Sequence, residues 1–152
     1  MKISEMIKSE NISLDLQGNT KKEILSELAT LVKSGGIINE EEFLKDLINR
    51  ENAGSTALEH GLAIPHVRTK NIEHFAIALG IKKDGIDFES VDGEKTKLFV
   101  LIATPEKYNN WHLEALVKIS KMFYNPINVT VLANAKSKEG VKKLIEQLEG
   151  MN

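Results

Sequence analysis

Two histidines of this sequence, His66 and His112, stand where an imidazole could do chemistry. In the stretch "GLAIPHVRT" (61–69), His66 directly follows a short apolar run that Pro65 interrupts. Proline fixes its own φ and biases the residue before it toward an extended backbone, so the position of the imidazole is well defined. Ligands tend to bind where the strands of an α/β sheet end, and we expect His66 to lie at such an end.

His112 is expected in the first turn of a helix that follows the apolar stretch "KLFVLIATP" (97–105). The free N–H groups and the positive dipole end of a first turn favour an anion and disfavour a cationic imidazole. We therefore expect a neutral His112 that can donate or accept a hydrogen bond. If the strands before the two histidines are parallel members of one sheet, both side chains lie at the same edge and face each other.

Phosphoryl transfer is the chemistry that such a pair favours. A neutral imidazole is a nucleophile toward phosphorus, and the phosphoryl group of a phosphohistidine is readily passed on. The protein has to supply positioning and hydrogen-bond donors for the phosphoryl oxygens. One histidine as acceptor, a second beside it, a helix N-terminus and one or two arginines meet these needs. Neither a metal nor another cofactor is expected.

The other two histidines, His60 and His74, are interpreted as a surface residue and a structural residue. A metal-dependent hydrolase that uses the four histidines as ligands is the alternative. Their spacing matches no compact site such as His-Glu-x-x-His, and the chain has no cysteine to add a thiolate ligand.

Composition limits the class of protein. The chain has 152 residues, with 41% hydrophobic and 28% charged, and we predict a single domain over 1–152. Lys+Arg 20 against Asp+Glu 22 gives a net charge of −2 with no basic stripe, so nucleic acid is not an expected partner. No apolar run approaches the roughly 20 residues that cross a bilayer, and the start carries no signal-peptide pattern. The absence of cysteine fits a cytoplasmic location.

Capping signals and apolar spacing place the elements. A short strand is expected over 12–16, a helix over 20–36 that starts with Thr20 and Glu23, and a second helix from Asn39 and Glu42 to a Gly/Ser/Thr loop. The apolar runs 74–81 and 97–103 are typical of central strands buried on both faces. A final helix is expected over 137–149.

Two segments are harder to interpret. A capped helix is expected over 110–124, and its buried face is predicted to contain Leu113, Leu116, Val117, Ser120 and Phe123. The β-branched residues of "NVTVL" (128–132) favour a strand. Helices and strands alternate throughout, so the sequence predicts a single-domain α/β fold.

The motifs resemble those of a known family. "RENAGSTALEHGLAIPHVRT" is similar to the active-site signature of enzyme IIA domains of the bacterial phosphoenolpyruvate-dependent phosphotransferase system, in the fructose/mannitol branch (type 2) that includes nitrogen-regulatory members. "ENISLDLQGNTKKEILSELATLVKSGGI" and "TPEKYNNWHLEALVKISKMF" resemble its opening and second-histidine segments. The resemblance implies a mixed, mostly parallel central sheet flanked by helices on both faces, and a short helix in place of the strand at 128–132.

The resemblance also implies roles for single residues. His66 matches the histidine that the phosphocarrier HPr phosphorylates, and His112 the second histidine, which supports the phosphoryl group. Arg50 matches an arginine that pairs with phosphate or with an acidic partner group. Thr56 is interpreted either as a donor near the site or as a hydroxyl that stabilises the turn. Arg68 is either a phosphate or partner contact, or a solvated side chain.

Two functions follow from the resemblance. As a phosphoryl carrier, the chain would accept phosphate from HPr on His66 and pass it to a IIB domain for sugar uptake. As a nitrogen-type regulatory module, it would bind and control other proteins according to its phosphorylation state. Docking is expected on an apolar surface made by Leu62 and Val67. Trp111 is interpreted either as part of that surface or as a residue of core or helix-cap packing.

The sequence departs from the family pattern at two places. Val67 replaces the usual small residue after the histidine and is expected to reshape the docking surface. Glu59 and His60 replace a commoner pair. His60 is interpreted either as a residue that changes the electrostatics of His66 or as an ordinary surface residue.

Overall fold

A five-stranded mixed sheet forms the centre of the computed structural model, which describes residues 1–151 apart from the side chain of Asn109. The strands are β1 (Ile12–Ser13), β2 (Leu62–Ala63), β3 (His66–Thr69), β4 (Ala76–Ile86) and β5 (Thr96–Pro105). β4 lies between β1 and β5, and β2 and β3 pair one after the other with the free side of β5.

Most of the strand pairings are parallel. β1 runs parallel to β4, and both β2 and β3 run parallel to β5. Only the central pair, β4 with β5, is antiparallel among these strands. The prediction of a mixed, mostly parallel sheet is therefore confirmed.

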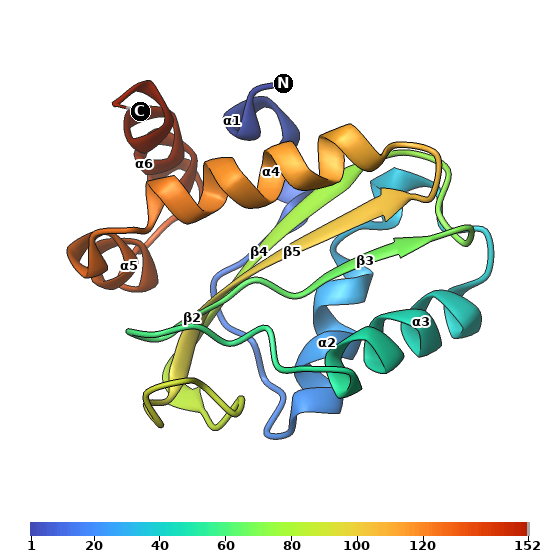
Figure 1. Cartoon of the computed structure of the whole chain (residues 1–152). Coiled ribbons are helices and arrows are strands. Elements are labelled where there is room, and N and C mark those ends of the chain that lie inside the picture. Colours follow the sequence, from blue (N-terminus) through green and yellow to red (C-terminus); the bar gives the residue numbers. More distant parts are fainter. Residues whose placement is uncertain (152) are drawn as a thin grey trace.

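Helices cover both faces of this sheet (Figure 1). They are α1 (Ile3–Met6), α2 (Lys21–Thr30), α3 (Glu40–Asn52), α4 (Asn109–Met122), α5 (Pro126–Ala133) and α6 (Lys138–Gly150), with 3-10 turns η1 (Ser9–Asn11) and η2 (Lys33–Gly35). α2 and α3 pack on one face of the sheet, and α1, α4, α5 and α6 pack on the other. The flanking helices expected on both faces are thus present.

The central strands are buried on both faces, as their continuous apolar runs predicted. Along β5, the side chains that join the core beneath α4 are those of Leu98, Val100 and Ile102. The alternate side chains, which join the core against α2 and α3, are those of Phe99, Leu101 and Ala103. This alternation fixes which residues near the end of β5 face α4.

Three helix starts agree with the capping signals. The side chains of Thr20, Asn39 and Ser137 each accept a hydrogen bond from a backbone N–H in the first turn of α2, α3 and α6. Each such cap satisfies one of the N–H groups that a helix leaves without an internal partner. For the cap expected at the start of α4, Tyr108 makes no side-chain cap bond, and the side chain of Asn109 lies outside the described part of the chain.

The strand favoured over 128–132 is wrong, because this segment lies within α5. Asn125 accepts a hydrogen bond from the backbone N–H of Ile127, and Pro126 occupies the first helical position. Both are helix-start signals, and the burial of Val129 and Leu132 against the sheet outweighs the strand preference of the β-branched residues. The short helix that the family resemblance implied is the correct reading.

The start of the chain differs from expectation in two ways. The strand predicted over 12–16 forms ladder pairs only at Ile12–Ser13. The short helix α1 was not predicted, and it is tied to α6 because the backbone N–H groups of Ile3 and Ser4 donate to the carboxylate of Glu149 at 2.6 and 3.0 Å.

Candidate active site

His66 follows the end of β2, as expected, but it is also the first residue of a further strand, β3. Pro65 separates β2 from β3 and does not end the strand path, because both strands pair with β5. The carbonyl of Pro65 accepts a hydrogen bond from the N–H of Ile102 at 2.9 Å, which keeps the break in register with β5.

The register of β3 places His66 and Arg68 on the α4 side of the sheet. His66 lies opposite Ile102 and Arg68 opposite Thr104, and Ile102 faces the core beneath α4. Paired residues of neighbouring strands project from the same face, so His66, Arg68 and Thr104 share that side. Val67 points the other way, into the core against α2 and α3.

The second histidine meets this face from α4. The ring centroids of His66 and His112 are 5.4 Å apart, with an interplanar angle of 62°. Arg50, at the end of α3, and Arg68 line the same hollow, whose volume is about 770 Å³. The sequence-based expectation that the two histidines face each other agrees with this geometry.

Two hydrogen bonds fix the tautomer of His66. Its Nδ1 lies 2.8 Å from the carbonyl oxygen of Ile64, which can only accept, so Nδ1 carries the hydrogen and donates. Its Nε2 lies 3.3 Å from Nη2 of Arg50, which can only donate, so Nε2 accepts. The lone pair of Nε2 therefore points into the hollow, next to a guanidinium group.

Arg50 is itself held in place. Its Nη1 donates to the carbonyl oxygen of Gly54 at 3.0 Å, four residues further along the chain. The loop after α3 thus positions the guanidinium whose other end reaches His66. A planar group held in this way is suited to bind an anion with parallel hydrogen bonds.

The surroundings keep His66 neutral. Burial lowers the pKa of His66 below its ordinary value, although the bond to the Ile64 carbonyl raises it. The charge of Arg50 lowers the pKa further, Glu51 raises it, and Arg68 lowers it. A neutral ring is the form that can act as a nucleophile at neutral pH.

His112 is also neutral, but for a different main reason than expected. Burial lowers its pKa to about 4, and the charges of His66, Arg68 and Arg50 act in the same direction. The sequence argument named the helix dipole alone as the cause. Nδ1 of His112 lies 2.8 Å from the hydroxyl oxygen of Thr104, at the end of β5.

Thr56 does not line the hollow but belongs to a buried network beneath the loop. Its hydroxyl donates to Glu51 at 2.5 Å, and its backbone N–H donates to the same carboxylate at 2.8 Å. Glu51 is also paired with Lys21 of α2 at 3.0 Å. Of the two interpretations of Thr56, this geometry fits the turn-stabilising hydroxyl.

Several residues expected at the docking surface lie elsewhere. Leu62 and Val67 are buried in the core, so neither offers an apolar surface to a partner. The buried side chain of Val67 therefore does not reshape the docking surface in the way that was expected. Trp111 remains 44% exposed and packs edge-on against Phe75. Val67 is among the residues that line the hollow, but its side chain belongs to the core, and the more exposed apolar side chains there are those of Leu113 and Leu116 of α4.

The buried face predicted for α4 is also corrected. Of the five residues predicted there, Phe123 is buried and Leu116 is half-buried, but Leu113, Val117 and Ser120 are exposed. The core side chains of α4 are those of Ala115, Ile119 and Met122. His112 belongs to the buried side, which is why it reaches Thr104.

His60 and His74 are exposed residues outside the hollow. The ring of His60 lies 3.6 Å from the carboxylate of Glu59, and that of His74 lies 3.8 Å from Glu73. His60 is not among the groups that shift the pKa of His66, so the geometry fits the plain surface position.

Sequence reasoning missed two residues that shape the site, Glu51 and Thr104. Glu51 follows Arg50 directly in the signature stretch, and a carboxylate at that position was the available signal. Thr104 is a polar residue at the end of an apolar strand, directly before Pro105. Its register opposite Arg68 could be known only from the pairing of β3 with β5.

Comparisons with known proteins agree with this arrangement. The family described as "Phosphoenolpyruvate-dependent sugar phosphotransferase system, EIIA 2" matches residues 5–148. The chain belongs to this family. Within residues 1–151, no group of three or more His, Asp or Glu side chains is placed to hold a metal ion. The described residues therefore contain no ligand cluster of the kind that the metal-dependent hydrolase alternative needs.

Three similar proteins are reported, one sequence relative and two solved structures. The fructose-specific EIIABC component of the phosphotransferase system of Bacillus subtilis is 35% identical over 148 residues, which are 97% of this chain and 23% of that protein. This chain therefore spans about a quarter of that relative.

Two solved structures have the same fold. The nitrogen regulatory protein IIA-Ntr from Neisseria meningitidis has a TM-score of 0.86 at 27% identity and covers 94% of this chain and 98% of its own. The mannitol enzyme IIA from Escherichia coli, in complex with phosphorylated enzyme IIB, has a TM-score of 0.79 at 20% identity and covers 93% and 99%. In the part of the chain described here, no helix is long and apolar enough to cross a membrane.

The low pKa of His112 makes the stability of this IIA domain depend on pH. An unfolded chain protonates this histidine near pH 6.5, whereas the folded chain does so only near pH 4. Between these values the unfolded state binds more protons, so stability falls as the pH is lowered through this range. We expect the free energy of unfolding to fall by about 1 to 2 kcal/mol more in the wild type than in His112→Gln between pH 7 and pH 5. Urea titrations at both pH values measure the difference, and parallel losses in the two proteins would contradict it.

Proposed function

We propose that this chain is a phosphoryl carrier of the phosphoenolpyruvate-dependent sugar phosphotransferase system. His66 accepts the phosphoryl group from phosphorylated HPr and passes it to a IIB domain that serves sugar uptake. The observation that carries the proposal is the Nε2 of His66, which has no hydrogen and lies beside Arg50 and the ring of His112. Family membership supports the same reaction class.

The tautomer of His66 suits it for nucleophilic attack. The Nε2 lone pair forms a bond to phosphorus while the bond between phosphorus and the donor breaks, and that electron pair leaves with the donor. Because Nε2 carries no hydrogen, no base is needed to remove a proton before attack. The positive charge that develops on the ring is stabilised at Nδ1–H by the carbonyl oxygen of Ile64, 2.8 Å away.

The positive charges near His66 favour the phosphorylated state. Arg50 and Arg68 line the hollow, and an incoming phosphoryl group brings negative oxygens to them. Guanidinium groups bind such oxygens with paired hydrogen bonds, which are among the stronger polar interactions in proteins. Arg50 would then exchange its contact with Nε2 for contacts with the phosphoryl oxygens.

His112 is suited to hold the phosphoryl group as a neutral donor. Phosphoryl oxygens accept hydrogen bonds, so the ring supports them when Nε2 carries its hydrogen. In that tautomer Nδ1 is an acceptor, and the hydroxyl of Thr104, 2.8 Å away, donates to it. Thr104 is a positioning residue in this arrangement, since it selects the tautomer of His112 without touching phosphate.

The outward face of α4 is suited to receive the protein partners. Leu113 is 63% exposed beside the histidines, and Val117, one turn further along, is 53% exposed. Leu113 lines the active-site hollow, Val117 an adjoining apolar one, and Leu116 lines both. Apolar side chains of this kind next to a transfer site exclude water from it when a partner docks. The IIA–IIB complex of the mannitol system supports a IIB domain as one such partner.

A nitrogen-type regulatory role is the second candidate. It is favoured by the high TM-score of 0.86 with the nitrogen regulatory protein IIA-Ntr. This role uses the same phosphorylation of His66, but the phosphoryl group changes binding to a regulated protein and is not passed to IIB. The two candidates therefore differ in the acceptor, and the first step is common to both.

Phosphorylation by the purified relay tests the carrier chemistry. With phosphoenolpyruvate, enzyme I and HPr, we expect the wild type to gain one acid-labile phosphoryl group and His66→Ala to gain none, as measured by intact mass at neutral pH. Nitrogen NMR of the ring should assign the bond to Nε2, the nitrogen that lacks a hydrogen. Phosphorylation of the His66→Ala protein, or a bond from phosphorus to Nδ1 of His66, would contradict the assignment.

His74→Ala is the matched control, since His74 is an exposed histidine away from the hollow. It should be phosphorylated like the wild type. Adding purified IIB domains of the fructose and mannitol types then separates the two candidates, because a carrier loses its phosphoryl group to one of them and a regulatory module keeps it.

Removing the Thr104 hydroxyl should slow phosphoryl transfer. Thr104→Val keeps the branched shape but loses the bond to His112, so the tautomer of that ring is no longer fixed. If the loss of this hydrogen bond raises the activation free energy by about 1.4 kcal/mol, phosphoryl transfer becomes roughly tenfold slower. Rapid-quench kinetics measure the rate, and the nitrogen shifts of the His112 ring report its tautomer. Thr104→Ser should restore both, and an unchanged rate and tautomer in Thr104→Val would refute this role.

A charge on the outward face of α4 should weaken docking. We expect Val117→Glu to raise the KM for phosphorylated HPr, for IIB, or for both about five- to tenfold with kcat nearly unchanged, since interface positions that matter cost more than about 1 kcal/mol. Val91→Glu is the control, because Val91 is 74% exposed and outside both hollows. Equal kinetics for the two variants would exclude α4 as the docking face.

A further inference from the structure

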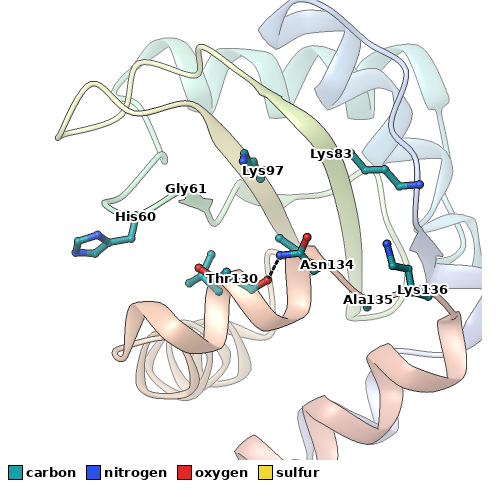
Figure 2. Close-up of a pocket in the computed structure, with 10 residues that line it drawn as sticks. His60, Gly61, Lys83, Lys97, Thr130, Asn134, Ala135 and Lys136 are labelled. Atoms are coloured by element: carbon teal, nitrogen blue, oxygen red, sulfur yellow. Dashed lines mark hydrogen bonds between the residues drawn. The ribbon is translucent and has the colours of Figure 1, made fainter.

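A second hollow lies at the opposite end of β5 from the histidines. Its volume is about 180 Å³, and four separate segments line it: 60–61, Lys83 of β4, Lys97 of β5, and part of α5 with the link to α6 (Figure 2). Lys97 and Thr104 are seven positions apart on β5, which corresponds to about 23 Å along a strand. The two hollows share no lining residue.

Three lysines give this hollow a positive charge. They are Lys83, Lys97 and Lys136, and within residues 1–151 none of them forms an ion pair with a carboxylate. Neighbouring Lys82, by contrast, is paired with Asp84 at 3.6 Å. The chain has 22 acidic residues against 20 basic ones, so a lack of carboxylates does not explain why three lysines without an ion pair line one hollow.

Two acidic groups contact His60, at one end of the hollow. Glu59 lies 3.6 Å from the ring of His60, and Asp92 accepts a hydrogen bond from the His60 backbone N–H at 2.9 Å. In Figure 2 the His60 ring points away from the other lining side chains, whereas the amino end of Lys136 points toward Lys83. These two carboxylates therefore contact His60, and neither forms an ion pair with Lys83 or Lys136.

The rest of the lining offers hydrogen bonds and a small apolar surface. The side-chain amide of Asn134 donates one hydrogen bond to the Thr130 carbonyl at 2.7 Å, which leaves its second N–H for a ligand (Figure 2). Val129 and Ala133 contribute apolar atoms. The C-terminal end of α5 carries about half a negative charge, which three ammonium groups outweigh.

We propose that this hollow binds the phosphate group of a small organic phosphate, away from the phosphotransfer site. The ammonium groups of Lys83, Lys97 and Lys136 hold the phosphate oxygens, and Asn134 adds a neutral donor. The carbon part of the ligand packs against Val129 and Ala133. No step of the proposed phosphoryl transfer uses these residues, so the proposal of this binding site does not depend on the carrier function.

Titration with glycerol 3-phosphate, followed by amide NMR at constant ionic strength, tests the proposal. We expect saturable shifts at Lys83, Lys97 and Asn134, and no comparable response to glycerol. Lys97→Gln and Lys136→Gln should each weaken binding at least threefold. Lys22→Gln is the matched control, because Lys22 is an exposed lysine of α2 on the other face of the sheet, and it should bind like the wild type.

Inorganic phosphate serves as a second probe. Equal binding of inorganic phosphate and glycerol 3-phosphate would overturn the organic part of the assignment, since it would mean that Val129 and Ala133 contact nothing. Shifts confined to Arg50 and His66, a linear response without saturation, or the same loss in Lys22→Gln as in Lys97→Gln would overturn the site as a whole. Phosphorylation of His66 in the Lys97→Gln protein should stay at the wild-type rate, which keeps a failure here distinct from a failure of the carrier function.

Discussion

The parallel pairing of β3 with β5 is the constraint on which the site depends. It sets His66 opposite Ile102 and Arg68 opposite Thr104, so that side chains from two strands project toward α4. A slip of one residue would turn His66 toward α2 and α3 and bring Val67 to the α4 side. The break at Pro65 is compatible with this pairing because the Pro65 carbonyl still accepts a hydrogen bond from β5. The rigid peptide before His66 therefore sets the register as well as the place of the ring.

Electrostatics then prepare the same site for an anion. Burial, together with Arg50 and Arg68, lowers the pKa of both histidines, which leaves positive charge on the guanidinium groups and lone pairs on the rings. The resting site thus places two guanidinium groups beside a ring nitrogen that carries a lone pair and no proton. A phosphoryl group fits this arrangement, since its phosphorus accepts the lone pair and its negative oxygens can bind the guanidinium groups. The buried contact of Glu51 with Lys21 and Thr56 lies beneath the loop and keeps the residue next to Arg50 fixed.

Much of this arrangement could be predicted from the sequence, and the failures have physical causes. Caps at Thr20 and Asn39 are local hydrogen bonds, and local signals predicted them. The strand favoured over 128–132 failed because β propensity reflects packing on a sheet, and here the β-branched residues pack as a helix face. The partner of His112, Thr104, could not be predicted, since the contact depends on how α4 sits above β5.

The misassigned face of α4 illustrates why helical spacing alone does not decide burial. Leu113 and Val117 recur at intervals of four, and Ala115, Ile119 and Met122 recur at three and four, so both stripes have the period of a helix. The stripe that packs on β5 is the one that also contains His112, so the face that presents the histidine to the site is the face that is buried. Leu113 and Val117 are left facing solvent beside the histidines, which is unfavourable for a protein that stays alone. That cost is explained if a second protein covers this face during transfer, so one helix both presents His112 to the site and offers the surface on which the donor or acceptor docks.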